Sequence, residues 1–282
     1  MTSENENPTS EVEDSQNNQY DSAWKTVIKA WLSDFLEFFY PDIHQAIDFS
    51  KKPVFIDKEM KESEPDSTMG DREADLLVKV YLKDGTAKYI GILIHIEVQS
   101  QQVTDFMERM FIYFYRAFDQ YKKDKIPVIG IALLTDDNPS YRPSEYDFDL
   151  LGFQLRMRIP MVKIIDFGQN GPLREKLETS ESPMTMIVKA QLKSLEVKKE
   201  GNRGKFEAAK EMIRQCYKHG YSREKMRLVM KFIAWVIRLP EAYKKEIKNY
   251  IKKTEEENKM EFVPLWERDS HEEGREKGRQ EG

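Results

Sequence analysis

The chain has 282 residues, of which 39% are hydrophobic and 34% are charged, and its formal net charge is −5 at pH 7. That length can bury one core of roughly 150–200 residues with an accessory unit beside it. No apolar run approaches the roughly 20 residues that a membrane helix needs, and the N-terminus has no signal-peptide pattern. The single cysteine, Cys216, excludes an internal disulfide framework and, with only four histidines, argues against a structural zinc site. We therefore expect a protein of the reducing cytoplasm that does not cross a membrane.

Charge is unevenly distributed along the chain. Residues 1–22 contain six acidic residues and no basic residue, whereas residues 187–253 contain 19 Lys or Arg and seven Asp or Glu, an excess of 12 positive charges. Such an excess suits contact with a phosphate backbone. Amphipathic helices with lysine-rich solvent faces would carry the same charges, and composition alone favours that simpler interpretation.

The first elements in chain order are a tail and a helix. Residues 1–20 are polar and aperiodic, which predicts a disordered tail. Apolar residues then recur at helical spacing over residues 24–39, so we expect a helix capped by Asp21 or Ser22 and ended by Pro41. A short helical turn over residues 42–48 would follow.

The middle of the chain predicts strands. We expect strands at 53–60, 74–82, 88–99, 127–135 and 161–167, with a turn at Asp84-Gly85, a helix at 103–122 and a loop at 136–150. The buried side of that helix would carry Phe106, Met110, Tyr113, Phe114, Ala117 and Phe118. A helix, three strands, a helix and a strand, with one more strand after a loop, predict an α/β fold with a mixed central sheet flanked by helices.

The last third of the chain predicts only helices. The candidates are 184–198, 203–218, 223–238 and 241–257, with Gly220 ending the second, Ser222 capping the third and Pro240 opening the fourth. We therefore divide the chain into a tail (1–20), an α/β core (21–172), an all-helical C-terminal lobe (173–260) and a charged C-terminal tail (261–282).

One strand carries polar side chains in an unusual setting. Residues two apart on a strand share a face, so Leu93, His95, Glu97 and Gln99 point the same way. A carboxylate in so apolar a strand is costly to bury unless it is paired or bound to a cation. If the preceding strand pairs with this one, Asp75 and Leu76 fall opposite about Gln99 and Glu97, depending on register. Two carboxylates that close together suit Mg²⁺ or Mn²⁺.

These residues match a known pattern. An Asp at a strand start, followed by Glu-x-Lys or Glu-x-Gln near the end of the next strand, is the PD-(D/E)XK nuclease motif, here Asp75 and Glu97-Val98-Gln99. The expected order of elements is also that of the nuclease core. Further segments resemble a bacterial family of transposase-like, recombination-promoting nucleases over about residues 20–282. They are YDSAWK (20–25), FLEFFYPDIHQAIDFS (35–50), FIDKEM (55–60), HIEVQSQ (95–101), FMERMFIYFYR (106–116), LLTDD (133–137) and WERD (266–269).

The resemblance implies a restriction-endonuclease-like fold and a metal-dependent DNA endonuclease that acts in recombination or on mobile-element DNA. Asp75 and Glu97 would hold Mg²⁺ or Mn²⁺, with the Val98 carbonyl as a third ligand. Gln99 stands where many such nucleases have a lysine, and a glutamine orients water but supplies no charge. Glu37 stands on the first helix, where the fold has an additional acid.

Two arginines on the next helix are candidates for DNA contact. Arg109 and Arg116 share one side of that helix with Tyr113. Arg109 either reaches a substrate phosphate or neutralises Glu97 or Asp105, and the sequence favours neither interpretation. His95 is more simply a structural residue, and Asp136-Asp137 is more simply part of a loop.

The alternative to a nuclease is a module that kept the fold, lost catalysis and binds DNA or another protein. Gln99 and the acidic N-terminal tail favour that alternative. A third and weaker hypothesis is a helical scaffold that assembles through residues 184–257. The sequence leaves open whether the protein forms a homodimer, as many nucleases that cut both strands do.

Overall fold

The computed structural model describes residues 23–56, 76–83, 91–239 and 241–258. It divides into two compact units, with Met184 ending the first and Thr185 beginning the second. The expected tail at residues 1–20, the caps Asp21 and Ser22, the turn at Asp84-Gly85, Pro240 and the C-terminal tail all lie outside the described residues.

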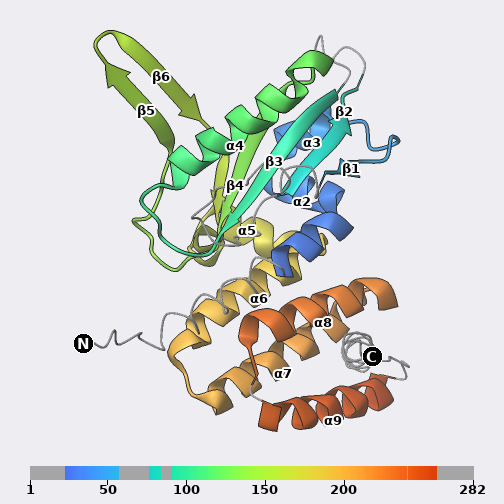
Figure 1. The fold of residues 1–282 in the computed structure, drawn as a ribbon. Helices are drawn as coiled ribbons and strands as arrows, with labels where there is room; N and C mark the ends of the chain where they lie inside the picture. Colours follow the sequence, from blue (N-terminus) through green and yellow to red (C-terminus); the bar gives the residue numbers. More distant parts are fainter. Residues whose placement is uncertain (1–22, 57–75, 84–90, 240, 259–282) are drawn as a thin grey trace, which may run out of the picture. The chain divides into compact units, whose positions relative to one another are not determined.

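The first unit contains a five-stranded mixed sheet with helices on both faces (Figure 1). Antiparallel pairing joins β1 to β2 and β2 to β3, and parallel pairing joins β3 to β4 and β4 to β7. This arrangement confirms the predicted mixed α/β class. In spatial order the strands are β1 (Val54–Phe55), β2 (Leu76–Tyr81), β3 (Gly91–Gln99), β4 (Val128–Leu134) and β7 (Met161–Lys163).

The register between β2 and β3 differs slightly from expectation. Leu76 pairs with Ile96 and Leu77 with His95, so Leu76 lies one residue away from the predicted position opposite Glu97. The strands are also shorter than predicted. The segment 53–60 gives only the two residues of β1 before the described residues end at Ile56, and 161–167 gives three strand residues followed by the 3₁₀ helix η2 (Ile164–Gly168).

The predicted helix over residues 24–39 is interrupted. Residues 23–30 are helical, Trp31 leaves helical geometry with φ −133° and ψ 46°, and α2 (Leu32–Phe39) follows. Pro41 opens α3 (Pro41–Ala46) as well as ending α2, since proline fits the first turn of a helix. The Tyr40 hydroxyl between these helices donates to the Ala132 carbonyl of β4 at 2.6 Å. Burial raises the pKa of this phenol, so it remains a donor.

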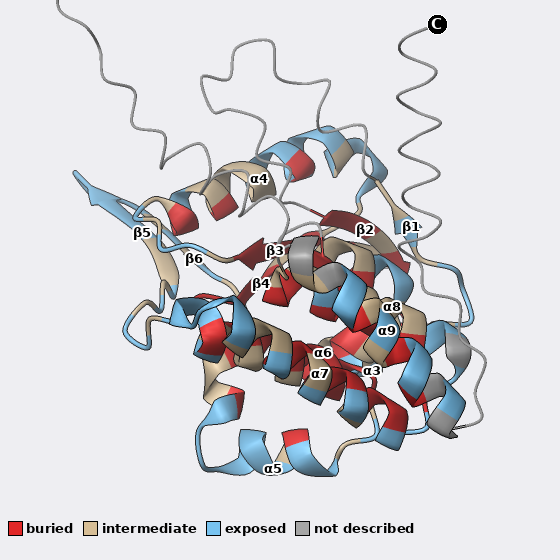
Figure 2. Cartoon of the chain, turned by 90° about the horizontal axis from the view of Figure 1, so that it is seen from below, coloured by how far each residue is buried: buried red, intermediate tan, exposed pale blue. Residues whose placement is uncertain are grey.

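Helix α4 (Phe106–Tyr121) is the crossover between β3 and β4 and ends in the 3₁₀ helix η1 (Lys122–Asp124). It covers one face of the sheet, while α2 and α3 lie on the other (Figure 1), and Figure 2 shows the central strands buried between these layers. Of the predicted buried side of α4, Phe106, Met110 and Ala117 are buried, but Phe118 is 48% exposed, which corrects that expectation.

Three elements were not expected from the sequence. The segment 136–150, interpreted as a loop, contains β5 (Glu145–Leu150), which pairs with β6 (Phe153–Arg158) in an antiparallel hairpin separate from the main sheet. Helix α5 (Pro172–Thr179) follows η2. The hairpin and α5 are rich in charged residues, so their sequences carry little of the apolar periodicity that predicts a strand or a helix.

The second unit is helical, as predicted. It contains all but the first residue of α6 (Met184–Glu196), followed by η3 (Val197–Lys199), α7 (Asn202–Lys218), α8 (Arg223–Ile237) and α9 (Glu241–Asn258). Gly220 follows the end of α7 with φ 64°, a conformation that favours glycine. Ser222 caps α8, because its hydroxyl accepts from the Lys225 amide.

Candidate functional site

The carboxyl-terminal half of β3 presents buried polar side chains to α4. Strand β3 pairs with β4 along the whole of this half, and with β2 as far as Ile96, which lies opposite Leu76. On its α4-facing side His95 and Glu97 are each 2% exposed and Gln99 is 8% exposed. The His95 ring packs against Tyr113 of α4 with centroids 5.2 Å apart. The alternation expected from the sequence therefore places a carboxylate in the core, where it needs a charged partner.

Arg109 of α4 is that partner. Its Nη2 atom lies 3.5 Å from Glu97 Oε1 and donates to Gln99 Oε1 at 2.8 Å. The guanidinium also lies over the Phe106 ring, 5.9 Å from its centroid. The Arg109 side chain is 11% exposed, so the ion pair with Glu97 is largely shielded from solvent. Of the two roles considered for Arg109, contact with Glu97 is the one that the structure shows.

Glu97 keeps one carboxylate oxygen open. Among the described residues, Glu97 Oε2 is buried and has no hydrogen-bond partner, and the same holds for Arg109 Nε. Buried polar atoms without partners are uncommon in native proteins, and they often mark a bound ion, a water or a catalytic role. An anionic oxygen in this state suits a divalent cation, which takes carboxylate ligands.

Gln99 is held at both ends of its amide. Its Oε1 accepts from Arg109, and its Nε2 donates to the Gln101 carbonyl at 2.7 Å. Its main-chain carbonyl accepts from the Thr135 amide at 2.8 Å and from the Thr135 hydroxyl at 3.3 Å, which fixes the end of β3 against the end of β4. Gln99 is thus a fixed hydrogen-bonding group beside Glu97.

The other predicted site residues are not all described or close together. Asp75 lies outside the described residues, one peptide bond before Leu76. Val98, whose main-chain carbonyl is the predicted third ligand, lies between Glu97 and Gln99 on β3 and is 1% exposed. Glu37 is exposed on α2, across the sheet from α4, and Arg116 is exposed on α4. The described residues that the structure brings together are Glu97, Gln99 and Arg109.

The structure adds a buried ion pair at the same end of the sheet. Lys163 of β7 contacts Asp136, just beyond β4, at 2.6 Å, and both side chains are at least 97% buried. Lys163 also donates to the Tyr141 carbonyl at 3.0 Å, and Asp136 accepts from the Asn138 amide at 2.9 Å. The loop interpretation of Asp136 missed this pair. A lysine within the apolar segment MVKII was the available signal, because a buried lysine requires an anion.

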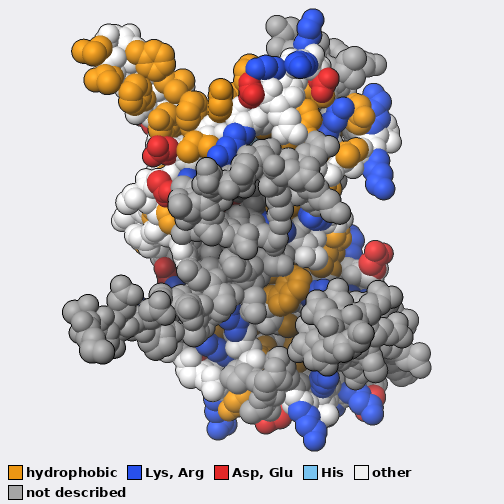
Figure 3. Space-filling view, viewed as in Figure 1, with side chains coloured by type: hydrophobic (Ala, Val, Ile, Leu, Met, Phe, Trp, Pro, Cys, Tyr) orange, Lys and Arg blue, Asp and Glu red, His pale blue; other side chains and the backbone are white. Residues whose placement is uncertain are grey.

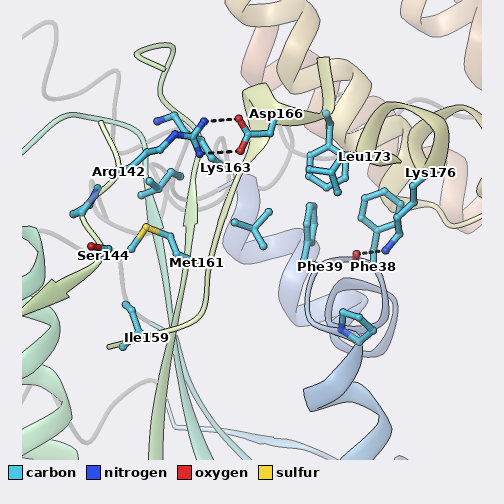
Figure 4. Close-up of a pocket in the computed structure, with 15 residues that line it drawn as sticks. Phe38, Phe39, Arg142, Ser144, Ile159, Met161, Lys163, Asp166, Leu173 and Lys176 are labelled. Carbon is cyan, nitrogen blue, oxygen red and sulfur yellow. Dashed lines mark hydrogen bonds and ion pairs between the residues drawn. The ribbon is translucent and has the colours of Figure 1, made fainter. Parts of the chain in front are cut away.

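A pocket of about 550 Å³ opens beside this pair (Figure 4). Leu134, the register partner of Gln99, lines it, as do Lys163 and the ion pair between Arg142 and Asp166. On the opposite wall Lys176 donates to the Phe38 carbonyl at 2.6 Å. Burial lowers the pKa of Lys176, and nearby Glu37 opposes that effect. The pocket lies at the carboxyl ends of the parallel strands, where open α/β sheets bind ligands.

Within the described residues, no group of three His, Cys, Asp or Glu side chains is placed to hold a metal ion. No helix in the same part of the chain is long and apolar enough to span a membrane. No protein-family model, curated protein or solved structure matches the chain.

Proposed function

We propose that the first unit is a metal-dependent DNA endonuclease with a restriction-endonuclease-like core, in which Glu97 and Asp75 hold Mg²⁺ or Mn²⁺. The observation that carries the proposal is the buried Glu97 carboxylate, whose Oε2 atom has no hydrogen-bond partner among the described residues. A carboxylate at the end of a central strand with an open oxygen suits a hard divalent cation better than it suits a structural ion pair alone. The order of the elements and the resemblance of Asp75 and Glu97-Val98-Gln99 to the nuclease motif support the same conclusion.

The chemistry that a bound cation supplies is polarisation of the scissile phosphate and activation of a water molecule for in-line attack. The chain's own residues would position the reacting groups. Gln99, fixed by Arg109 and the Gln101 carbonyl, would orient the water. Arg109 would supply the positive charge that the motif lysine supplies elsewhere, stabilising charge that develops on the phosphate.

The second candidate is a module that kept this fold without catalysis. Arg109 contacts both Glu97 and Gln99 and so already neutralises the carboxylate in part, as expected of a core that has replaced a metal ion with an internal cation. The two candidates differ in one property that can be measured directly, which is the affinity of the folded protein for Mn²⁺.

The test is plasmid cleavage by the purified full chain with Mg²⁺ or Mn²⁺. We expect nicking or linearisation, and we expect Glu97→Gln and Asp75→Asn to reduce its rate by about a hundredfold or more, because metal ligands matter at least as much as the groups that orient them. Glu108→Gln is the matched control, since Glu108 is exposed on α4 and should leave the rate unchanged. No cleavage, together with no change in melting temperature on adding Mn²⁺, would contradict the nuclease proposal and favour the inactive module.

A further inference from the structure

The hairpin of β5 and β6 has one apolar face and one polar face. Every second cross-strand pair is apolar, and the pairs between them are charged or polar. The apolar pairs are Tyr146–Met157, Phe148–Leu155 and Leu150–Phe153. The polar pairs are Glu145–Arg158, Asp147–Arg156 and Asp149–Gln154, each joined by a side-chain hydrogen bond of 2.6–2.8 Å. A hairpin with this pattern is built to cover something with its apolar face.

Among the described residues, only the base of that apolar face is covered by other parts of the chain. Tyr146 stacks on Phe111 of α4 with centroids 4.9 Å apart and ring planes 8° apart. Tyr146 and Met157 also pack against a buried cluster that includes Phe106 and Met110 of α4. Farther out, Phe148, Leu150 and Phe153 are 41%, 56% and 62% exposed. The hairpin projects from the sheet (Figure 1), and Figure 3 shows hydrophobic side chains gathered along it.

The turn at the tip adds an apolar residue in an unfavourable conformation. Leu151 has φ 51° and is 99% exposed, and Gly152 follows with φ 85°. Two successive residues with positive φ give the tight turn that suits a two-residue hairpin, in which asparagine is strongly preferred at the first position. Leucine there is strained, and no described residue covers its side chain. A contact outside the chain would explain why leucine is present.

Helix α4 carries a second exposed apolar strip that continues the hairpin face. Phe111, Tyr115 and Phe118 lie at helical spacing i, i+4 and i+7, so they share one side of the helix. Tyr115 is 57% exposed and Phe118 is 48% exposed. Because Phe111 stacks on Tyr146, the strip and the hairpin face form one surface, which we call the hairpin–helix surface.

We propose that the hairpin–helix surface binds the same surface of a second copy of this chain, with the hairpin of each copy lying on the α4 strip of the other. A two-fold axis makes this exchange self-consistent, because each contact between hairpin and helix is then made twice. A projecting ridge and a flat strip on one surface complement each other across such an axis. The inference stands whether or not the first unit is a nuclease.

The exposed area matches what a small stable dimer needs. The aromatic side chains of Tyr115, Phe118, Phe148 and Phe153 are 41–62% exposed, which leaves roughly 100 Å² of each to be covered. Over two copies these side chains alone supply about 800 Å², and Leu150, Leu151 and the atoms around them raise the total to about 1,200 Å². That value is at the lower end for specific protein–protein interfaces.

The charges on the hairpin argue against other classes of partner for it. The polar face of the hairpin carries Glu145, Asp147 and Asp149 against Arg156 and Arg158. A nucleic acid or an anionic membrane requires a basic surface, whereas this polar face has an excess of one acidic residue. Because the charges are paired within each hairpin, burial of the apolar area would be the main driving force for association. A second copy presents the same apolar area and the same paired charges.

The test begins with sedimentation equilibrium of the full chain. We expect the wild type to have twice the monomer mass. The hairpin variant (Leu150→Lys with Phe153→Lys) and the helix variant (Tyr115→Glu with Phe118→Glu) should each weaken the dimer at least about tenfold. Val54→Lys is the control, because Val54 is an exposed apolar residue of β1 outside this surface, and it should leave the mass unchanged.

Mixing the two variants tests the exchange itself. In a mixed dimer the lysines of one hairpin meet the glutamates of the other copy's helix, while the remaining hairpin and helix are both wild type. An equimolar mixture should therefore dimerise although neither variant does so alone. If the hairpins contacted only each other, the helix variant, which keeps a wild-type hairpin, would dimerise by itself as the wild type does.

Three results would overturn the proposal. The first is a wild type that is monomeric at about 100 μM, a concentration at which weak interfaces of this size begin to associate. The second is a dimer that persists in both surface variants. The third is an equimolar mixture of the variants that stays monomeric. Leu151→Asn is a variant whose loss of dimerisation could not be caused by misfolding, because asparagine favours the positive-φ conformation at the turn. It should fold at least as stably as the wild type while weakening the dimer.

Discussion

At the scale of single residues, the Glu97–Arg109 ion pair is largely buried although its hydrogen-bonding atoms are only partly satisfied by the described residues. Glu97 has one oxygen near a guanidinium 3.5 Å away and another with no partner among the described residues, while the same arginine makes its shorter contact with Gln99. Buried ion pairs add stability only when their remaining hydrogen-bonding atoms are satisfied. With this geometry, Arg109 is the residue that neutralises the buried charge of Glu97.

We therefore expect Arg109→Met to destabilise the first unit by about 3–5 kcal/mol, because it leaves the Glu97 charge buried without its cation. The double variant Glu97→Gln with Arg109→Met should be more stable than Arg109→Met alone, since no net charge then remains in the core. Urea denaturation of the wild type, both single variants and the double variant measures the coupling, which should exceed about 1 kcal/mol.

An exposed pair on the same unit supplies the control for that cycle. Arg156 contacts Asp147 at 2.8 Å with its side chain 60% exposed, so Arg156→Met should leave the free energy of unfolding nearly unchanged. Equal losses for Arg156→Met and Arg109→Met would show that the Glu97–Arg109 pair has no special weight in the core.

The sequence predicted part of this site and missed part of it for physical reasons. Strand alternation was sufficient to place Glu97 and Gln99 on one face, and helical spacing made Arg109 a candidate. Nothing local to Asp136 distinguishes it from a turn residue, because its burial depends on Lys163, 27 positions away. A pair of this kind is visible in a sequence only when the lysine is recognised as out of place in an apolar strand.

At the scale of elements, the hairpin and α7 show opposite degrees of predictability. Residues 145–150 alternate polar and apolar as a strand should, but the charged half of the pattern resembles a solvated loop when the partner strand is not considered. Helix α7 was predicted correctly because its buried side repeats at helical spacing through Ala208, Ala209, Met212, Ile213 and Cys216. The break at Trp31 had no Gly or Pro signal and could not be predicted.

Packing on the buried face of α7 makes the thiol of Cys216 unreactive. Burial raises the pKa of Cys216 to about 12, so at pH 8 the thiolate fraction is about one in ten thousand. We expect a disulfide reagent to modify the folded chain about a thousandfold more slowly than the denatured chain. Because the folded state retains this proton longer than the unfolded state, stability should also fall as pH rises from 9 towards 12.

A cysteine moved to the exposed side of the same helix is the control for that measurement. Arg214 is exposed on α7, so Arg214→Cys in a Cys216→Ser background should react at the rate of a free thiol. Rapid modification of native Cys216 under the same conditions would mean that α7 opens readily or that its packing differs from that described here.

At the scale of the whole molecule, charge is divided between the two units. The candidate centre lies in the first unit, and the excess of 12 positive charges over residues 187–253 lies in the second. The helices that carry those charges also bury apolar side chains, so the amphipathic interpretation of this segment is correct at the level of structure.

If the second unit binds DNA by sequence-independent phosphate contacts, affinity should fall steeply with salt, by about a thousandfold between 50 and 200 mM for roughly six contacts. Arg214 and Lys218 are exposed one turn apart on α7. Replacing both with glutamine should lower the slope of log K against log salt by up to about 2, because each lost contact releases one counterion fewer. Replacing Lys51 and Lys52, exposed in the first unit, should leave the slope unchanged. Equal slopes for both double variants, measured by fluorescence anisotropy with duplexes of unrelated sequence, would instead mean that these α7 charges serve only to solvate the helix.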